Sequence, residues 1–207
     1  MSAADALKPR TVVLLGHRNV GKTSLVDRFL NNRFSPHQTA TVGAAFGAKD
    51  VECSDGRMVT LGIWDTAGAE RYESMTRIYY RSAKAAVVCF DLTDRSSWSA
   101  VTRWIGELKE HEPACRIVLV GTKLDLVREG QERDMAEEEV ELFCEEINAH
   151  YLETSAMTGE NVREIFDLVT NEYVKHFGAE LLEREHDSAR YERLNVSEPK
   201  GRRRGCC

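Results

Sequence analysis

The sequence predicts a doubly wound α/β domain, with a mostly parallel six-stranded sheet and one antiparallel hairpin strand. Three observations support this fold class. Short, continuous apolar runs are typical of parallel strands that are covered on both faces. These runs alternate with amphipathic helical segments, which implies right-handed crossovers within one sheet. Two further strand-like segments flank "SDG" (residues 54–56), which is a hairpin signal.

Six segments are predicted as strands. The apolar runs of the parallel core are Thr11–Leu15, Ala85–Phe90 and Arg116–Val120. The hairpin pair is Ala45–Cys53 and Met58–Trp64, and His150–Glu153 is a weaker sixth strand. In doubly wound sheets the ligand lies beyond the carboxyl ends of the strands. The loops expected around one site are therefore those after Leu15, Trp64, Phe90, Val120 and Glu153.

Apolar residues at helical spacing predict three amphipathic helices. Their apolar faces consist of Trp98, Val101, Ile105 and Leu108; of Val140, Phe143, Cys144 and Ile147; and of Val162, Ile165, Phe166 and Val169. The second and third helices are preceded by Asp134 and Asn161, each with Glu three residues later. Both pairs resemble capping boxes.

Composition excludes several classes of protein. The 207 residues are 42% hydrophobic and 30% charged, as expected for one globular domain with tails. No apolar run approaches the roughly 20 residues that span a bilayer. The N-terminal "MSAADALKPR" lacks the apolar region of a secretory signal, so we expect a cytosolic protein. Four scattered cysteines indicate reduced thiols rather than disulfides or a zinc site: Cys53, Cys89, Cys115 and Cys144.

The charge is unevenly distributed. The net charge is −6, but from Val196 onward four basic residues face one acidic residue, a net +3 that leaves the rest near −9. An acidic body argues against nucleic-acid binding, which needs a basic face. We expect a flexible N-terminus (1–10), one domain (11–177) and a polar, mobile tail (178–207).

The first loop, "GHRNVGKTS", fits the phosphate-binding pattern G-x-x-x-x-G-K-[ST]. Glycines let backbone N–H groups surround phosphate oxygens, and the following helix directs its positive end at them. The alternative is a glycine-rich turn, but the apolar strand before the loop and the amphipathic segment after it favour phosphate binding. The predicted contacts are Gly16, Arg18, Asn19, Val20, Gly21, Lys22, Thr23 and Ser24.

Three further loops carry chemistry. Asp65, at the end of a strand, can hold a water of a Mg²⁺ ion that the Thr23 hydroxyl binds, and Gly68 can offer its backbone N–H to a phosphate. In "GTKLD" (Gly121–Asp125), Asp125 can accept two hydrogen bonds from guanine, and Lys123 can lay its stem across the base. The alternatives are turn-capping or segment-opening aspartates. The "ETSAM" loop supplies Ser155, Ala156 and Met157 for the base.

Together these four motifs resemble the Ras superfamily of small GTPases over roughly Thr11–Phe177. "TVGAAF" (Thr41–Phe46), "RYESMTRIYYRSAKAA" and the terminal Cys206–Cys207 resemble the Rab family, and most closely its divergent Rab twenty-four branch. The resemblance implies a GTP/GDP switch with Mg²⁺ held by Thr23, Thr41 and Asp65. It also implies Phe34 at the guanine edge and an effector surface of Phe46, Trp64 and Tyr79, which could equally be core aromatics.

Two departures from the family pattern bear on function. Thr122 stands where the guanine loop usually has Asn, and its hydroxyl can bridge to the phosphate loop or to the base. Losing one hydrogen bond of the amide would cost about 1 kcal/mol, or about tenfold in affinity. Ala69 stands where the family has the water-positioning Gln, so no catalytic residue is assigned and intrinsic hydrolysis is expected to be about tenfold slower or more. Arg18 can crowd an incoming arginine finger or reach the phosphates itself.

The tail "KGRRRGCC" is either a solvated charged end, a nuclear address or a lipid anchor. The resemblance implies geranylgeranylation of Cys206 and Cys207, because two chains anchor stably where one does not. It also implies an exchange factor, a GTPase-activating protein, effectors, an escort protein and a dissociation inhibitor, with a monomeric domain on late-endosomal or autophagic membranes. The alternatives are a GTP-loaded interaction module that hardly hydrolyses, and a P-loop kinase or ATPase, which the guanine motifs disfavour.

Overall fold

The computed structural model of the chain describes residues 10–69, 73–81 and 83–176, without the side chains of residues 10 and 73–75. Residues 10–173 belong to one compact unit, and of a second unit that includes both chain ends only residues 174–176 are described. Among the described helices, none is long and apolar enough to cross a membrane. Cys206, Cys207 and the rest of the predicted tail lie outside the described residues.

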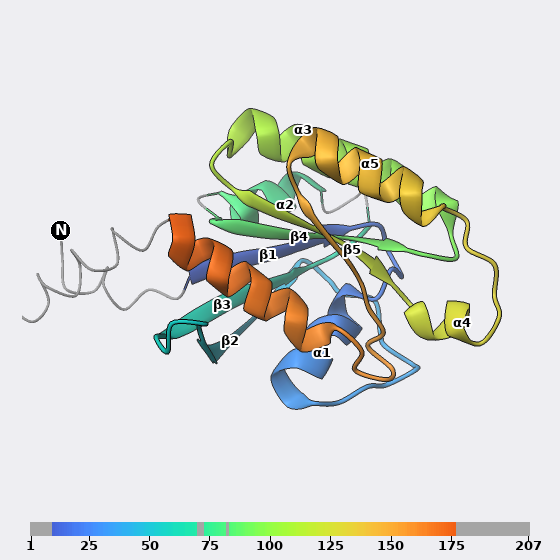
Figure 1. The fold of residues 1–207 in the computed structure, drawn as a ribbon, viewed down its shortest axis with the longest axis horizontal. Helices are drawn as coiled ribbons and strands as arrows, with labels where there is room; N and C mark the ends of the chain where they lie inside the picture. The colour runs from blue at the N-terminus through green and yellow to red at the C-terminus, as the bar shows by residue number, and fades with distance from the viewer. Residues whose placement is uncertain (1–9, 70–72, 82, 177–207) are drawn as a thin grey trace, which may run out of the picture. The chain divides into compact units, whose positions relative to one another are not determined.

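A six-stranded sheet runs through the compact unit in the order β2-β3-β1-β4-β5-β6 (Figure 1). The strands are β1 (Arg10–Gly16), β2 (Ala44–Glu52), β3 (Met58–Thr66), β4 (Ala85–Asp91), β5 (Arg116–Thr122) and β6 (His150–Glu153). Within the described chain only β2 and β3 pair in antiparallel fashion, with Phe46 opposite Trp64. The predicted fold class is confirmed. Strands β3 and β5 each run two residues further than predicted.

Helices cover both faces of this sheet (Figure 1). One face carries α2 (Glu73–Tyr80), α3 (Trp98–His111) and α5 (Glu137–Ile147). The other carries α1 (Lys22–Asn31) and residues 162–173 of a last helix, which is described as far as residue 176. The short helices η3 (Arg95–Ser97) and α4 (Leu124–Arg128) lie in loops. All three helices predicted from apolar spacing are therefore present.

Aromatic contacts fix the helices against each other and the sheet. Trp98 packs edge-on between Phe90 and Phe143, at 5.0 and 5.2 Å between ring centroids. On the opposite face Phe29 stacks on Phe166 at 3.8 Å. Such pairs add about 0.5–1.5 kcal/mol each to their area burial. The Phe29–Phe166 contact joins α1 to the last helix and so helps to fix the direction of α1.

The predicted capping boxes are wrong. Helix α5 starts at Glu137 after an extended Ala136 whose side chain makes no cap. Met135 is fully buried, and the carboxylate of Asp134 accepts the backbone N–H of Arg95 at 3.1 Å instead. Asn161 has a left-handed φ of 58°, and its amide donates to the carbonyl of Glu153 at 2.7 Å. In both places a tertiary contact takes the side chain that local sequence assigned to the helix end.

The four predicted thiols in the domain are free. Cys53, Cys89 and Cys144 are buried and Cys115 is half-buried. Burial raises the pKa of Cys89 and of Cys115 to about 12 and that of Cys144 to about 11. Because the thiolate is the reactive species, these cysteines are inert at neutral pH.

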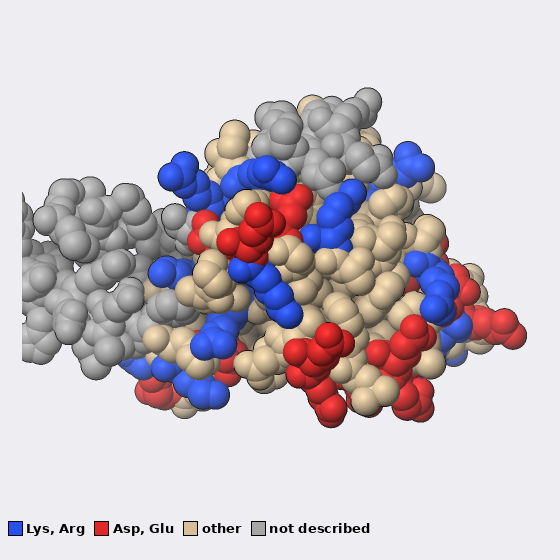
Figure 2. All heavy atoms as spheres, turned by 90° about the horizontal axis from the view of Figure 1, so that it is seen from above, with Lys and Arg blue, Asp and Glu red and all other residues tan. Residues whose placement is uncertain are grey.

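Acidic and basic side chains alternate over the face shown in Figure 2. They form no continuous basic surface on that face, whereas phosphate-backbone binding depends on clustered Lys and Arg. The acidic net charge of the chain agrees with this distribution.

Candidate functional site

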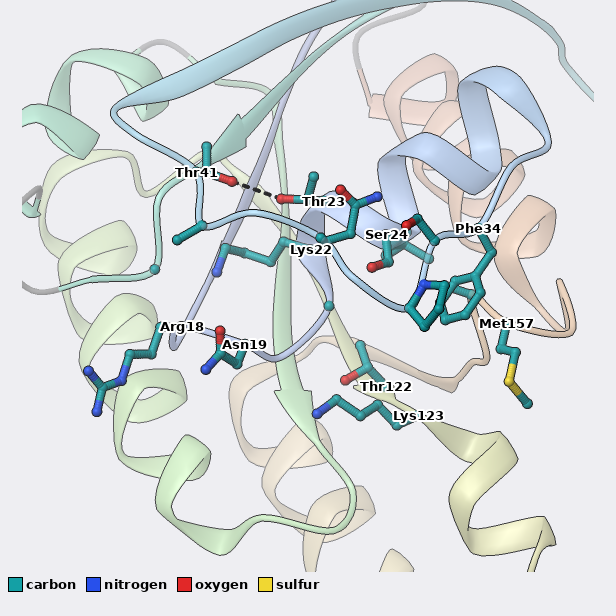
Figure 3. Close-up of a pocket in the computed structure, with 18 of the residues that line it drawn as sticks. Arg18, Asn19, Lys22, Thr23, Ser24, Phe34, Thr41, Thr122, Lys123 and Met157 are labelled. Carbon is teal, nitrogen blue, oxygen red and sulfur yellow. Dashed lines mark hydrogen bonds between the residues drawn. The ribbon is translucent and has the colours of Figure 1, made fainter.

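A cavity of about 960 Å³ lies beyond the carboxyl ends of the strands (Figure 3). This volume is at the upper end of the range for small-molecule and cofactor sites. The residues that form the wall of this cavity lie within the segments 18–25, 34–41, 66–69, 122–126 and 154–157. Four of the five predicted loops therefore surround one site. The loop after Phe90 contributes no residue to the wall, and the segment that leads into β2 takes part instead.

Most of the predicted nucleotide contacts lie in this wall. They are Arg18, Asn19, Gly21, Lys22, Thr23, Ser24, Phe34, Thr41, Gly68, Thr122, Lys123, Asp125, Ala156 and Met157. Ala69 lines the cavity as well. Four predicted residues lie behind the wall, and each is hydrogen-bonded to a residue in it: Gly16, Val20, Asp65 and Ser155.

The glycines of the first loop set its path around the cavity. Gly16 has a φ of +143°, and a Cβ there would lie 2.2 Å from the carbonyl oxygen of Cys89, so only glycine fits. Gly21, with a φ of +91°, is the N-cap residue of α1. The loop thus leads into a helix N-terminus, where backbone N–H groups and the helix dipole favour an anion.

Lys22 is enclosed by the same loop. Its ammonium donates to the carbonyl oxygens of Gly16 at 3.0 Å and His17 at 2.8 Å. Burial lowers the pKa of Lys22, and the nearby carboxylate of Asp65 opposes that shift. Figure 3 shows the side chain extended beneath the loop, with its amine at the same end of the cavity as Thr23 and Thr41. The loop therefore fixes a positive charge at the phosphate-binding end.

Three oxygen-bearing side chains form a hydrogen-bonded chain next to Lys22. The Thr23 hydroxyl donates to Asp65 Oδ2 at 2.7 Å and lies 2.9 Å from the Thr41 hydroxyl, which is drawn as a dashed line in Figure 3. Burial raises the pKa of Asp65, while the Thr23 hydrogen bond and the charge of Lys22 lower it.

The second oxygen of Asp65 shows what this cluster can hold. Oδ1 is buried and accepts no hydrogen bond from any residue in the described part of the chain. A carboxylate and two hydroxyls are the hard oxygen donors that Mg²⁺ prefers, and this ion keeps several of its own waters. The donor set therefore fits Mg²⁺ bound by few protein ligands.

Polar side chains line the opposite end of the cavity. The Ser155 hydroxyl donates to Asp125 Oδ1 at 2.6 Å, which orients the carboxylate. The ammonium of Lys123 forms an ion pair with Asp91 Oδ2 at 2.5 Å, and the Lys123 backbone has a left-handed φ of 62°. Asp91 is buried and also accepts hydrogen bonds from Thr93. The ion pair holds the Lys123 side chain in place, so its stem lies along the cavity.

Thr122 connects the two ends. Its buried hydroxyl lies 2.6 Å from the carbonyl oxygen of Val20 and 2.8 Å from that of Phe90. Of the two roles left open by the sequence, the structure shows the bridge to the phosphate loop. A single hydroxyl hydrogen serves both acceptors, where an amide would offer two hydrogens.

Comparison with known proteins agrees with this geometry. The model of the Ras family matches residues 11–175. The Ras-related protein Rab-24 of Dictyostelium discoideum is 47% identical over 164 residues, covering 79% of this chain and 80% of its own. The chain belongs to the Rab family of small GTPases. The human Ras-related protein Rab-30 is 42% identical (75% of each chain), as is the GTP-binding protein ypt5 of Schizosaccharomyces pombe (76% of this chain and 74% of its own).

The predicted aromatic triad of this Rab-family chain is contiguous. Trp64 lies between Phe46 at 4.9 Å and Tyr79 at 4.8 Å between centroids. Phe46 is 50% exposed, and the neighbouring chain segments expose Val42 and Ile78 to 75% and 71%. The triad is thus both a packed cluster and an exposed apolar surface, so the two interpretations of these aromatics are compatible.

Sequence reasoning missed several residues at the site of this Rab-family chain. From the segment between Phe34 and Thr41, it did not identify the wall residues Ser35, Pro36, Gln38, Thr39 and Ala40. Their position between two predicted contacts was the available signal. Asp91 was also missed, because nothing local links it to Lys123. The exposed Arg18 lies at the rim, and Figure 3 shows its guanidinium turned away from Lys22.

Replacing Thr122 by Val should destabilise the protein. Valine keeps the shape but removes the hydroxyl, which leaves two buried carbonyl groups without this donor. We expect the free energy of unfolding to fall by about 1–3 kcal/mol, measured by urea denaturation with saturating nucleotide. Thr102→Val on the exposed face of α3 is the control, with a change of about 0.5 kcal/mol or less. Equal losses in both variants would contradict the bridging role.

Proposed function

We propose that this chain is a GTP/GDP switch that recruits effectors to endomembranes of the vesicle-transport system and hydrolyses GTP slowly on its own. One observation carries the proposal. A single cavity has a glycine loop, a lysine and a magnesium-type oxygen cluster at one end and an oriented aspartate at the other. A guanine nucleotide needs both ends at once.

The phosphate end binds the charged part of the nucleotide. Backbone N–H groups of residues 18–24 surround phosphate oxygens, and Lys22 neutralises the outer phosphates. Thr23, Thr41 and Asp65 would hold Mg²⁺, which supplies charge neutralisation at the phosphate oxygens. Thr41 contributes only while the segment before β2 is closed, so its contact distinguishes the GTP-bound state from the GDP-bound state.

The base end selects guanine. Asp125 accepts hydrogen bonds from the ring N1–H and the exocyclic amine, and adenine lacks this pair of donors. The Lys123 stem covers one face of the base, and Phe34 packs at its edge. The backbone of Ser155, Ala156 and Met157 closes the remaining side, where a backbone N–H of this loop would donate to O6. The Thr122 hydroxyl binds protein groups rather than the base, namely the carbonyl oxygens of Val20 and Phe90.

The loop after β3 lacks a group for the chemical step. Ala69 lines the cavity but presents only a methyl group, so no side chain at this position orients the attacking water. Arg18 is turned away from Lys22 and supplies no charge there. An activating protein that brings both Arg and Gln would restore the missing groups in trans.

Restoring the carboxamide should accelerate hydrolysis. We expect Ala69→Gln to raise the single-turnover rate about tenfold or more at saturating Mg²⁺, a barrier change of about 1.4 kcal/mol. The control is Ala69→Leu, which adds bulk without a carboxamide and should stay at the wild-type rate. Equal rates for the wild type and Ala69→Gln would contradict the proposed cause of slow hydrolysis.

Magnesium binding should weaken as the pH falls. Burial raises the pKa of Asp65, so its carboxylate takes up a proton at a higher pH than an exposed aspartate and then no longer binds the ion. Between pH 7.5 and 5.5 the Mg²⁺ affinity of the protein–GDP complex should fall more steeply than the Mg²⁺ affinity of free GDP. Free GDP is the control, because its decrease measures the effect of phosphate protonation alone. Chelator-induced release of GDP measures it. Parallel pH profiles would exclude a role of Asp65.

The same site also supports a second candidate function, in which the chain remains GTP-loaded and acts as an interaction module with negligible hydrolysis. Ala69 is the observation that favours it. The nucleotide that co-purifies with the protein separates the candidates: mostly GDP supports a turning-over switch, mostly GTP supports the module, and ATP would overturn both.

Effector and membrane contacts complete the proposed switch. Phe46, Trp64 and Tyr79, with Val42 and Ile78 beside them, offer effectors an apolar surface next to the nucleotide-sensing loops. The compartment we propose is the late endosome or the autophagic membrane. Exchange factor, activating protein, escort protein and dissociation inhibitor follow from membership of the Rab family.

The terminal cysteines should carry two geranylgeranyl groups. Each buried CH₂ contributes about 0.8 kcal/mol to membrane binding, and each basic residue of the tail adds about 1 kcal/mol at an anionic leaflet. Intact-mass measurement of protein from cells should show both additions, and Cys206→Ser/Cys207→Ser should show neither and move to the cytosol. Unmodified cysteines in the wild-type protein would refute the anchor.

A further inference from the structure

Arg28 connects α1 to the loop that follows β6. Its Nε donates to the carbonyl oxygen of Ala156 at 2.7 Å, and its Nη2 donates to that of Met157 at 2.6 Å. The remaining nitrogen, Nη1, donates to the backbone and side-chain oxygens of Asn32, both at 3.3 Å. The planar guanidinium thus binds acceptors from two chain segments that are about 130 residues apart.

Arg28 reaches this loop from the side opposite the nucleotide. Ala156 and Met157 line the large cavity, but Arg28 does not. It lines instead a second cavity of about 390 Å³, together with Gly159. A Cβ at Gly159 would lie 3.9 Å from Cδ of Arg28, so the loop also packs on the arginine stem. Arg28 therefore supports this part of the cavity wall from behind, through residues 156–159.

The position of Arg28 on α1 strengthens the connection. Asn32 ends the helix with a left-handed φ of 53°, and its N–H donates to the Arg28 carbonyl at 3.0 Å. The guanidinium therefore lies at the negative end of the helix dipole, which stabilises a cation. Lys22 and Thr23 are the first two residues of the same 10-residue helix, at its opposite end. One short rigid element thus carries the phosphate contacts at its start and holds the base loop near its end.

We propose that Arg28 is a positioning residue for guanine recognition. By holding the carbonyls of Ala156 and Met157, it keeps the backbone of this loop against the base and sets how long the nucleotide remains bound. The inference rests on the proposed function, because it assigns a role in retaining a guanine nucleotide. It extends that function to a side chain that touches neither base nor phosphate.

The chemistry of the guanidinium explains why an arginine suits this place. Its donors are fixed in a plane and can bind two successive carbonyl groups at once. A lysine ammonium on a flexible stem can reach one carbonyl but does not span both in a fixed geometry. The conservative variant Arg28→Lys should therefore restore only part of the function.

The test measures the release of a ribose-labelled fluorescent GDP from the full chain, in Mg²⁺ and excess unlabelled GDP. Arg28→Ala should release GDP about tenfold faster, equivalent to about 1.4 kcal/mol, and Arg28→Lys about threefold faster. Arg163→Ala is the matched control. It removes the same charge from the wall of the same second cavity, where Arg163 pairs with Asp167 across an exposed 3.3 Å contact. Its release rate should equal that of the wild type.

A second nucleotide distinguishes positioning from general loosening of the fold. The diphosphate of 2-aminopurine riboside lacks O6, the atom assigned to the base loop. Arg28→Ala should therefore leave its release within about twofold of the wild-type rate. Equal acceleration of both nucleotides, or no acceleration of GDP release, would overturn the proposal. If Arg28→Ala does not fold, judged by thermal melting in excess GDP, Arg28→Lys provides the same comparison.

Failure of this inference is distinguishable from failure of the proposed function. A wild-type chain that retains GDP, together with an Arg28→Ala variant of unchanged release rate, overturns only the role of Arg28. A wild-type chain that retains no guanine nucleotide overturns the proposed function, and the role of Arg28 with it.

Discussion

The buried carboxylate of Asp65 is the constraint on which the arrangement of the phosphate end depends. An ionised carboxylate in a protein interior is strongly unfavourable unless it is paired and hydrogen-bonded. Lys22 supplies the charge and Thr23 the hydrogen bond, and Thr41 joins through Thr23. Two segments far apart in sequence are thus gathered around one group at the end of β3. The remaining oxygen, Oδ1, accepts no hydrogen bond from a described residue and is the atom to which we assign a bound cation in the proposed function.

The base end is joined to the phosphate end by protein contacts rather than by the nucleotide alone. Thr122 binds the backbone of Val20, and Arg28 binds the backbone of Ala156 and Met157. Because both links are made to backbone carbonyls, they fix the course of the loops whatever side chains the loops carry. A nucleotide then meets two preformed halves at a set distance, which reduces the ordering that binding requires.

What the sequence could predict follows from how local each signal is. The strands and the glycine loop are determined by neighbouring residues, and both were predicted closely. The ion pair between Lys123 and Asp91 joins residues 32 positions apart, and Arg28 binds a carbonyl group about 130 positions away in the sequence. No local sequence pattern predicts either contact. The capping prediction at Asp134 was wrong for the same reason, since a tertiary contact to Arg95 competes with the helix end. Predictions from sequence are therefore weakest where a side chain serves two elements.

Sensing a phosphate and cutting it depend on different atoms of the loop after β3. A Cβ at Gly68 would lie 2.5 Å from the carbonyl oxygen of His17 and from the backbone nitrogen of Arg18, so this glycine meets the phosphate loop backbone to backbone. The sensing that we propose uses the peptide group of Gly68 and the carboxylate of Asp65, and neither group belongs to residue 69. Successive strand residues point to opposite faces, so Trp64, the neighbour of Asp65, belongs to the aromatic surface on the other side of the sheet. In the switch we propose, Ala69 would remove a group needed for hydrolysis and leave these two sensing groups intact, so that the chain reports on its nucleotide while depending on a partner to cleave it.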